Sequence, residues 1–272
     1  MNGNNTPYND FGTWLRSQFP FRVQKISVNA GLSCPNRDGS IGRGGCIYCD
    51  NNTFNPSYCD TASSIRTQIE AGKRFFARKY PDMKYLAYFQ AYTNTYGSTD
   101  RLKRLYEEAL GTDGVVGIVI GTRPDCMPDE LLDYLEDLNR QTFMIVEYGI
   151  ESANDETLRR INRGHTFECA CRTIERTAER GITTGGHIII GLPGEDEAGT
   201  ADIGNKAGHT QDTPDADNTR DKACGGIRRT PVSHIYGRGI HPAYKPVYTI
   251  SAQGHGAGTL CVAVAEGTSH CP

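Results

Sequence analysis

The chain has 272 residues, which is enough for one large α/β domain or two small ones. Its formal net charge of −3 gives no overall basic field for nucleic acid, and no apolar run approaches the roughly 20 residues that span a bilayer. The polar N-terminus lacks an export-signal pattern, so we expect a soluble cytoplasmic protein. In such a protein, ten cysteines favour metal or cluster ligation over disulfides.

From about residue 11 to residue 194, short apolar runs alternate with amphipathic stretches. The predicted strands are 25–30, 84–90, 115–121, 144–149 and 186–190. The predicted helices are 63–80, 100–110, 128–140, 155–161 and 167–180, with start signals at Thr99, Pro128 and Thr166 and a stop signal at Gly181. Continuous apolar strands that alternate with helices indicate a parallel sheet covered by helices. Five such units predict a barrel or partial barrel, with an open doubly wound sheet as the competing fold.

The segment that follows the first predicted strand is rich in cysteine and glycine. Eleven residues separate Cys34 from Cys46, and two separate Cys46 from Cys49. The glycines between them allow a tight loop, and three thiolates would hold three irons of a [4Fe–4S] cluster and leave the fourth iron open. Two other sites fit the spacing: a redox dithiol, and a four-cysteine zinc site or cluster completed by Cys59.

This loop resembles the radical S-adenosylmethionine (SAM) superfamily, whose usual signature is Cys-x3-Cys-x2-Cys with an aromatic residue before the last cysteine. Tyr48 stands in that aromatic position, whereas the gap after Cys34 is longer than usual. The long gap is similar to that of the YhcC-like subgroup and, more distantly, of the elongator catalytic subunit. The resemblance to the YhcC-like proteins covers roughly residues 11–199, including the segments 34–49, 51–59, 89–96, 121–126, 161–165 and 191–195.

The resemblance implies a reaction and its cofactors. SAM would chelate the open iron, and one electron from the reduced cluster would cleave SAM to methionine and a 5′-deoxyadenosyl radical that abstracts a substrate hydrogen. A reductant such as flavodoxin or ferredoxin would supply the electron. The elongator resemblance suggests RNA as the substrate, and a small metabolite or a protein side chain is equally compatible. The competing function is a non-catalytic zinc- or iron–sulfur-binding module.

Other residues at the predicted strand ends are expected to line the site, because barrel active sites lie at the carboxyl ends of the strands. The resemblance places SAM near Tyr48 of the loop, near Gln90 and Thr93 after the second strand, near Glu147, Glu151 and Ser152 of the fourth, and near Gly191 after the fifth. Further polar residues at these ends are either site residues or ordinary turn and helix residues: Arg123, Asp125, Cys126, Arg160, Arg163 and His165.

The composition changes after residue 200. Residues 201–272 contain no Phe, Met or Trp and show no hydrophobic periodicity, which is typical of a segment that cannot form a core. Codons for residues 211–220, read one nucleotide later, permit Lys-Ile-His-Gln-Met-Gln-Ile-Ile-Arg, which resembles a sixth strand.

We therefore predict a radical SAM core in residues 1–200, a partial (βα)6 TIM-like barrel interrupted after its fifth strand. Residues 201–272 are predicted to be an aberrant, frameshifted tail that leaves the fifth strand as an unpaired edge.

Overall fold

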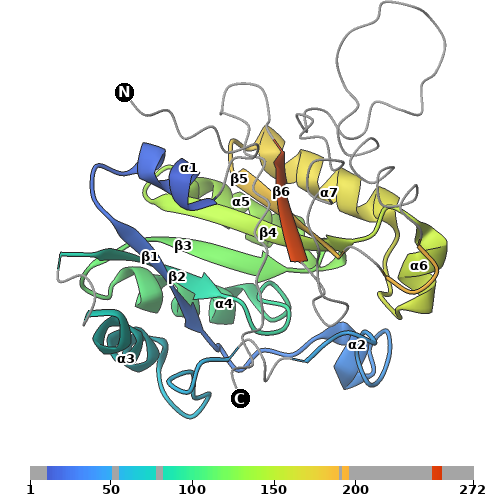
Figure 1. Cartoon of the computed structure of the whole chain (residues 1–272), viewed down its shortest axis with the longest axis horizontal. Helices are drawn as coiled ribbons and strands as arrows, with labels where there is room; N and C mark the ends of the chain where they lie inside the picture. The colour runs from blue at the N-terminus through green and yellow to red at the C-terminus, as the bar shows by residue number, and fades with distance from the viewer. Residues whose placement is uncertain (1–10, 51–54, 78–81, 190–191, 196–246, 253–272) are drawn as a thin grey trace, which may run out of the picture.

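The structure is a computed structural model that describes residues 11–50, 55–77, 82–189, 192–195 and the strand at 247–252 (Figure 1). The strands are β1 (Val23–Val28), β2 (Lys84–Phe89), β3 (Val115–Thr122), β4 (Phe143–Glu151), β5 (Thr183–Ile189) and β6 (Val247–Ala252). The helices are α1 (Phe11–Gln18), α2 (Pro35–Asp38), α3 (Ile65–Ala77), α4 (Thr99–Leu110), α5 (Asp129–Asn139), α6 (Asp155–Arg160) and α7 (Phe167–Glu179), with a 3-10 turn at Pro124–Cys126.

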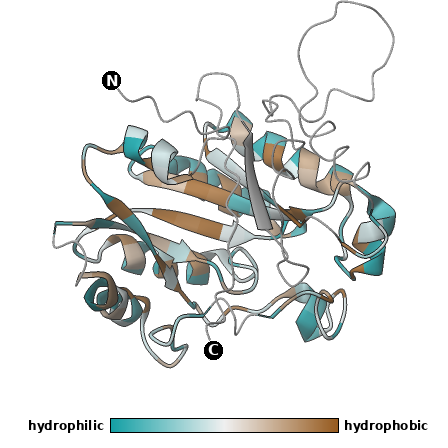
Figure 2. Ribbon diagram, in the orientation of Figure 1, coloured by the Kyte–Doolittle hydropathy of each residue, from teal (hydrophilic) through white to brown (hydrophobic). Residues whose placement is uncertain are grey.

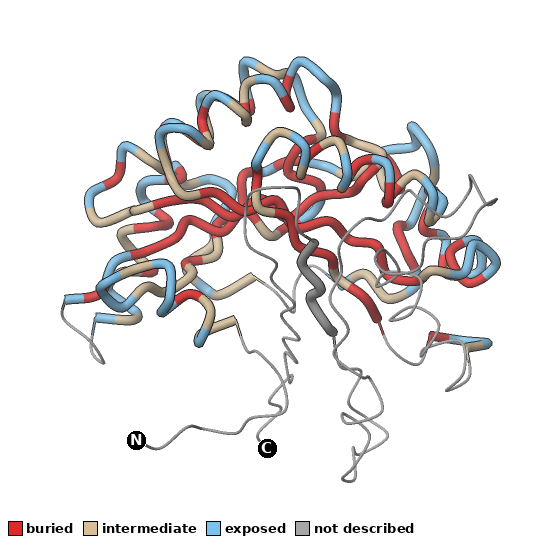
Figure 3. Tube along the Cα trace, turned by 90° about the horizontal axis from the view of Figure 1, so that it is seen from above, coloured by how far each residue is buried: buried red, intermediate tan, exposed pale blue. Residues whose placement is uncertain are grey.

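The first five strands lie side by side in chain order, and each pairs in parallel with the next. This order distinguishes the two folds that the sequence leaves open, because a doubly wound sheet reverses its strand order at a switch point. Helices α3, α4, α5 and α7 all contribute side chains to one hydrophobic core on the same face of the sheet. Figures 2 and 3 show apolar, buried residues along the central strands and polar, exposed residues on the outer helix surfaces. The chain is thus an α/β protein of the partial-barrel type.

The opposite face of the sheet is concave and partly filled by α1. Leu15 of α1 packs with Leu86, Tyr88, Val119 and Ile145, which alternate with the residues that face the outer helices. Period-two alternation sends successive side chains of a strand to opposite faces, so these residues line the inside of the barrel. Helix α1 therefore covers the inner face with apolar side chains.

A contact between two distant strands shows how strongly the sheet curves. Lys25 of β1 lies 2.6 Å from Glu147 of β4, although β2 and β3 lie between these strands in the sheet. In a flat sheet, three strand spacings of about 4.8 Å would separate the backbones of β1 and β4 by about 14 Å, and the side chains would stand perpendicular to the sheet. The short distance requires the sheet to bend toward a barrel.

One prediction about the end of the chain is wrong. The fifth strand is not an unpaired edge, because β6 pairs with it in antiparallel fashion from Thr184↔Ala252 to Ile189↔Val247. This short run was not predicted as a strand because a proline stands directly before it in the sequence, whereas the strand itself begins at Val247. Residues 196–246 and 253–272 lie outside the described residues, and the frameshift hypothesis therefore stays a prediction.

Most predicted elements are confirmed, with shifted ends. Strand β5 begins at Thr183, three residues before its predicted start, and α7 begins after Thr166, whose side chain accepts a hydrogen bond from the Cys169 amide at 3.2 Å. Helix α4 begins at Thr99 with Ser98 as its N-cap residue. None of the described helices is long and apolar enough to cross a bilayer.

Candidate active site at the carboxyl ends of the strands

The cysteine loop begins shortly after β1 and folds back on the short helix α2. Cys34 is the N-cap residue of α2, and Gly39 ends this helix in the left-handed conformation with φ of 95°. The amides of Ile41 and Gly42 then donate to the Pro35 carbonyl at 2.9 and 3.1 Å, so the loop returns to the start of the helix. These turns bring the segment with Cys46 and Cys49 back beside the segment with Cys34.

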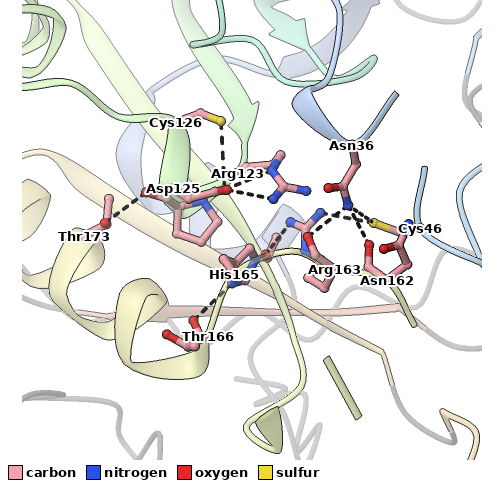
Figure 4. A network of polar contacts seen from close by, with 12 residues as sticks. Asn36, Cys46, Arg123, Asp125, Cys126, Asn162, Arg163, His165, Thr166 and Thr173 are labelled. Atoms are coloured by element: carbon pink, nitrogen blue, oxygen red, sulfur yellow. Dashed lines mark hydrogen bonds and ion pairs between the residues drawn. The ribbon is translucent and has the colours of Figure 1, made fainter. Parts of the chain in front are cut away.

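Cys46 is the most deeply buried cysteine of the three, with 7% of its surface exposed. Two buried nitrogen donors point at its Sγ: Asn36 Nδ2 at 3.5 Å and Arg163 Nη1 at 3.7 Å (Figure 4). Donors of this kind stabilise a thiolate, which is the form that binds metal. Asn36 and Arg163 lie more than 120 residues apart in the chain, and neither was predicted to contact a cysteine.

The polar surroundings of Cys46 suit an anionic group such as an iron–sulfur cluster. Among the described residues, no three His, Cys, Asp or Glu side chains form a group that could hold a single metal ion. Several buried polar atoms around Cys46 have no hydrogen-bond partner in the described part of the chain: Asn36 Oδ1, Tyr48 Oη, Arg123 Nη1 and Arg163 Nε. The unpartnered N–H groups of the two buried arginines, beside a loop with three cysteines, suit a large anionic group.

Cys59 does not resemble a fourth metal ligand. Its thiol donates a hydrogen bond to the Ser27 carbonyl at 3.1 Å. Burial raises the pKa of Cys59 to about 11, so the thiol stays protonated at neutral pH. A zinc site needs a thiolate, and this environment therefore argues against the four-cysteine alternative.

The predicted SAM-binding residues after β2 are partly structural. Gln90 accepts a hydrogen bond from Ser27 Oγ at 3.2 Å, and the Thr93 amide donates to Ser33, next to Cys34, at 3.3 Å. Asn94 Nδ2 bridges the carbonyls of Phe89 and Gly121 at 2.9 and 2.8 Å, which ties the ends of β2 and β3 together. This segment therefore lies beside the start of the cysteine loop, and its contact with SAM stays a prediction.

The end of β4 meets the segment that follows β5. Ser152 Oγ donates to Glu195, and Arg163 lies 3.5 Å from the Glu151 carboxylate. Tyr48 packs on the hydrophobic cluster that contains Leu192, between these two strand ends. Burial, followed by the charge of Glu151, raises the pKa of Tyr48 well above its ordinary value. The predicted residues Tyr48, Glu151 and Ser152 therefore share one region, whereas Gly191 lies outside the described residues.

Backbone strain is concentrated around the same region. Tyr92, Glu151 and Asn162 have positive φ values of 64°, 70° and 55°, and they are the only non-glycine residues of the described part with positive φ. All three lie at or just beyond elements whose ends face the cysteine loop. Such strain persists where the surrounding structure enforces it, most often at functional sites.

Glu147 lies deeper, inside the barrel. Its side chain is 2% exposed, and its carboxylate is held by Lys25 Nζ at 2.6 Å and by His187 Nε2 at 3.2 Å. Burial acts to raise the pKa of Glu147, but the charge of Lys25 and the hydrogen bond from His187 outweigh it and hold the pKa well below its usual range. Both carboxylate oxygens thus have a hydrogen-bond partner in the barrel, and the contact of Glu147 with SAM stays a prediction.

Arg123 is buried and forms a bidentate ion pair with Asp125, through Nε at 2.9 Å and Nη2 at 2.7 Å (Figure 4). His165 lies nearby, and its Nε2 is 3.2 Å from the Gly149 carbonyl oxygen. Burial, with the charge of Arg163, lowers the pKa of His165 to about 4, so the ring is neutral at pH 7. Arg160 instead lies near the surface, where it binds the Pro193 carbonyl at 2.7 Å and pairs with Glu156.

Sequence reasoning missed four residues of this region: Lys25, Asn36, Asn162 and His187. A charged or imidazole side chain inside an apolar strand was the available signal for Lys25 and His187. Asn36 and Asn162 lie in loops, where their polar character is ordinary, so no local signal distinguishes them.

Comparisons with known proteins agree with this geometry. The radical SAM superfamily profile matches residues 36–206. Protein YhcC of Escherichia coli is 41% identical over 191 residues, which cover 70% of this chain and 60% of that protein. The uncharacterized protein YtqA of Bacillus subtilis is 39% identical over 189 residues, 70% of this chain and 59% of that protein. Elongator complex protein 3 of Schizosaccharomyces pombe is 33% identical over 78 residues, 29% of this chain and 14% of that protein.

The chain thus spans about three fifths of the length of its YhcC and YtqA relatives. The profile match covers more than half of the chain and includes two of the three loop cysteines, the end of β4 and the segment after β5. Together with a parallel sheet in chain order and a cysteine loop after its first strand, this match assigns the protein: the chain belongs to the radical SAM superfamily and is a YhcC-like member of it.

Proposed function

We propose that this protein is a radical SAM enzyme that binds a [4Fe–4S] cluster through Cys34, Cys46 and Cys49. The observation that carries the proposal is the buried Cys46 Sγ, which faces the nitrogen donors of Asn36 and Arg163 at the carboxyl ends of the strands. When bound, the cluster would supply the electron that cleaves SAM reductively, and the resulting radical would abstract hydrogen from a substrate.

The chain's own residues would bind and orient SAM. Tyr48 lies between the ends of β4 and β5, where its ring can cover the adenine. Ser152 and Glu151 present a hydroxyl and a carboxylate at the strained end of β4, which suits the ribose hydroxyls or the methionine amino group. Gln90 and Thr93 lie in the segment after β2, whose backbone contacts Ser33 beside the cysteine loop. Arg123 and Arg163 carry positive charge toward the thiolates.

The inner face of the barrel would exclude water from the radical. Helix α1 covers this face with apolar side chains, and Lys25 Nζ lies 4.1 Å from the centroid of the Phe11 ring of α1. Closed, dry sites protect reactive intermediates from side reactions. Lys25, Glu147 and His187 lie on this inner side, and each is held by a partner.

The substrate and the partners are proposals as well. The elongator resemblance makes RNA the first substrate class to test, and a flavodoxin or ferredoxin the first reductant. A cytoplasmic location suits both.

Anaerobic reconstitution tests the proposal. The protein should take up about four iron and four sulfide atoms per chain, as a [4Fe–4S] cluster requires. With dithionite and SAM it should release 5′-deoxyadenosine. Cys46→Ala should lose the cluster and the cleavage, whereas the matched variant Cys59→Ala should keep both. Zinc in place of iron, or equal loss in the two variants, would support the non-catalytic four-cysteine module instead.

A further inference from the structure

We propose that Arg163 is a positioning residue that sets the reduction potential of the cluster through a hydrogen bond to Cys46 Sγ, with Asn36 packed beside the same sulfur. This inference rests on the proposed function, because it requires Cys46 to be a cluster ligand. It assigns a role to a buried residue that does not belong to the cysteine signature.

Arg163 is held in place from several directions. Its Nη2 donates to the Gly149 carbonyl at 2.6 Å, and the same nitrogen lies 3.5 Å from the Glu151 carboxylate. Its Nη1 is thereby directed at Cys46 Sγ, 3.7 Å away (Figure 4). Only 8% of the side chain is exposed, so water can screen its charge very little.

Asn36 is equally constrained. It is fully buried, and its Nδ2 donates to the carbonyls of Asn162 and Arg163 at 2.6 and 3.0 Å while it faces Cys46 Sγ at 3.5 Å. Asn162 Nδ2 returns a hydrogen bond to the Gly45 carbonyl at 2.8 Å. The loop after α6 and the cysteine loop are therefore joined by reciprocal hydrogen bonds on both sides of Cys46.

The backbone of the loop after α6 leaves room for Asn36 to lie against Cys46. Gly164 has φ of 82°, and a Cβ there would lie 2.7 Å from Asn36 Oδ1. Asn162, two residues earlier, also has positive φ, of 55°. A side chain at position 164 would push Asn36 away from Cys46, so glycine at this position permits the contact.

These contacts favour the reduced state of the cluster. Reduction adds one negative charge to the cluster and its thiolates, and a buried guanidinium with N–H···S hydrogen bonds stabilises that charge. Hydrogen bonds to the sulfurs and solvent exposure are established determinants of cluster potentials. Arg163 also contacts Gly149 and Glu151 at the end of β4, so the same side chain links the cluster ligand to the proposed SAM site.

A redox titration of the reconstituted full-length protein, monitored by electron paramagnetic resonance, tests the inference. Arg163→Gln should shift the equilibrium between reduced and oxidised cluster at least tenfold toward the oxidised form, which is a potential about 59 mV more negative. Arg163→Lys keeps the charge but cannot reach both Gly149 and Cys46, so its shift should be smaller and in the same direction. Arg159→Gln, an exposed arginine of α6, is the matched control and should leave the potential unchanged.

A wild-type potential in Arg163→Gln, at full iron content, would overturn the inference. Should that variant assemble no cluster, Arg163→Lys decides: a more negative potential supports the inference, and an unmoved one overturns it. Failure of the proposed function would look different, because the wild-type protein itself would then hold no cluster or cleave no SAM.

Discussion

The contacts among Lys25, Glu147 and His187 inside the barrel allow a direct test of the fold, through the substitution Lys25→Met. Methionine keeps an unbranched side chain against Phe11 and Tyr88 but removes the ammonium that lies 2.6 Å from Glu147. The Glu147 carboxylate, with 2% of its side chain exposed, would keep only His187 as a partner. Breaking a buried ion pair by removing one partner typically costs about 3–5 kcal/mol.

A loss of that size should be easy to measure. For a domain of this size about 1 kcal/mol lowers the melting temperature by roughly 2–4 °C, so the expected decrease is roughly 6–20 °C. Urea unfolding of the full chain gives the free energy directly. The matched control is Lys73→Met, which removes the pair with the 41% exposed Glu70 and a hydrogen bond to the Asp113 carbonyl, and should cost about 1 kcal/mol.

The double variant Lys25→Met/Glu147→Gln separates the ion pair from simple packing. With no buried charge left unpaired, it should recover much of the loss, and the double-mutant cycle should give a coupling energy of about 2 kcal/mol or more. Additive effects would refute the reasoning. The pH dependence offers a second check: because the folded-state pKa of Glu147 is lowered, its contribution is fully present above the ordinary value of 4.5 and is lost as the pH falls below it.

Three further predictions concern the site and the tail. Because the pKa of His165 is lowered to about 4, the unfolded chain binds more protons than the folded chain between pH 4 and 6.5. The free energy of unfolding should therefore fall as the pH is lowered through this window. The decrease should be smaller in His165→Gln. Tyr48→Ala should weaken SAM binding about tenfold by calorimetry at unchanged iron content, by loss of stacking worth about 1–3 kcal/mol; an unchanged Kd would remove Tyr48 from the site. Sequencing the gene should reveal a single-base error near codon 200, and an intact reading frame would disprove the frameshift.

The sequence by itself determined the features that depend on local pattern. Apolar runs and helix start signals predict the five parallel strands and the main helices, because strand burial and N-capping depend on residues close in the chain. The spacing of Cys34, Cys46 and Cys49, with the glycines between them, indicates a cluster loop for the same reason. The family resemblance in residues 11–199 is likewise readable from the sequence alone.

Only the tertiary structure decided which distant residues meet. Lys25 and Glu147 are 122 positions apart, and Arg163 and Cys46 are 117 apart, so no local pattern predicts either contact. The pairing of β6 with β5 was missed because a proline before a short strand reads as a break when its partner strand is unknown. Periodicity shows that a side chain is buried, whereas the curvature of the sheet determines what it is buried against.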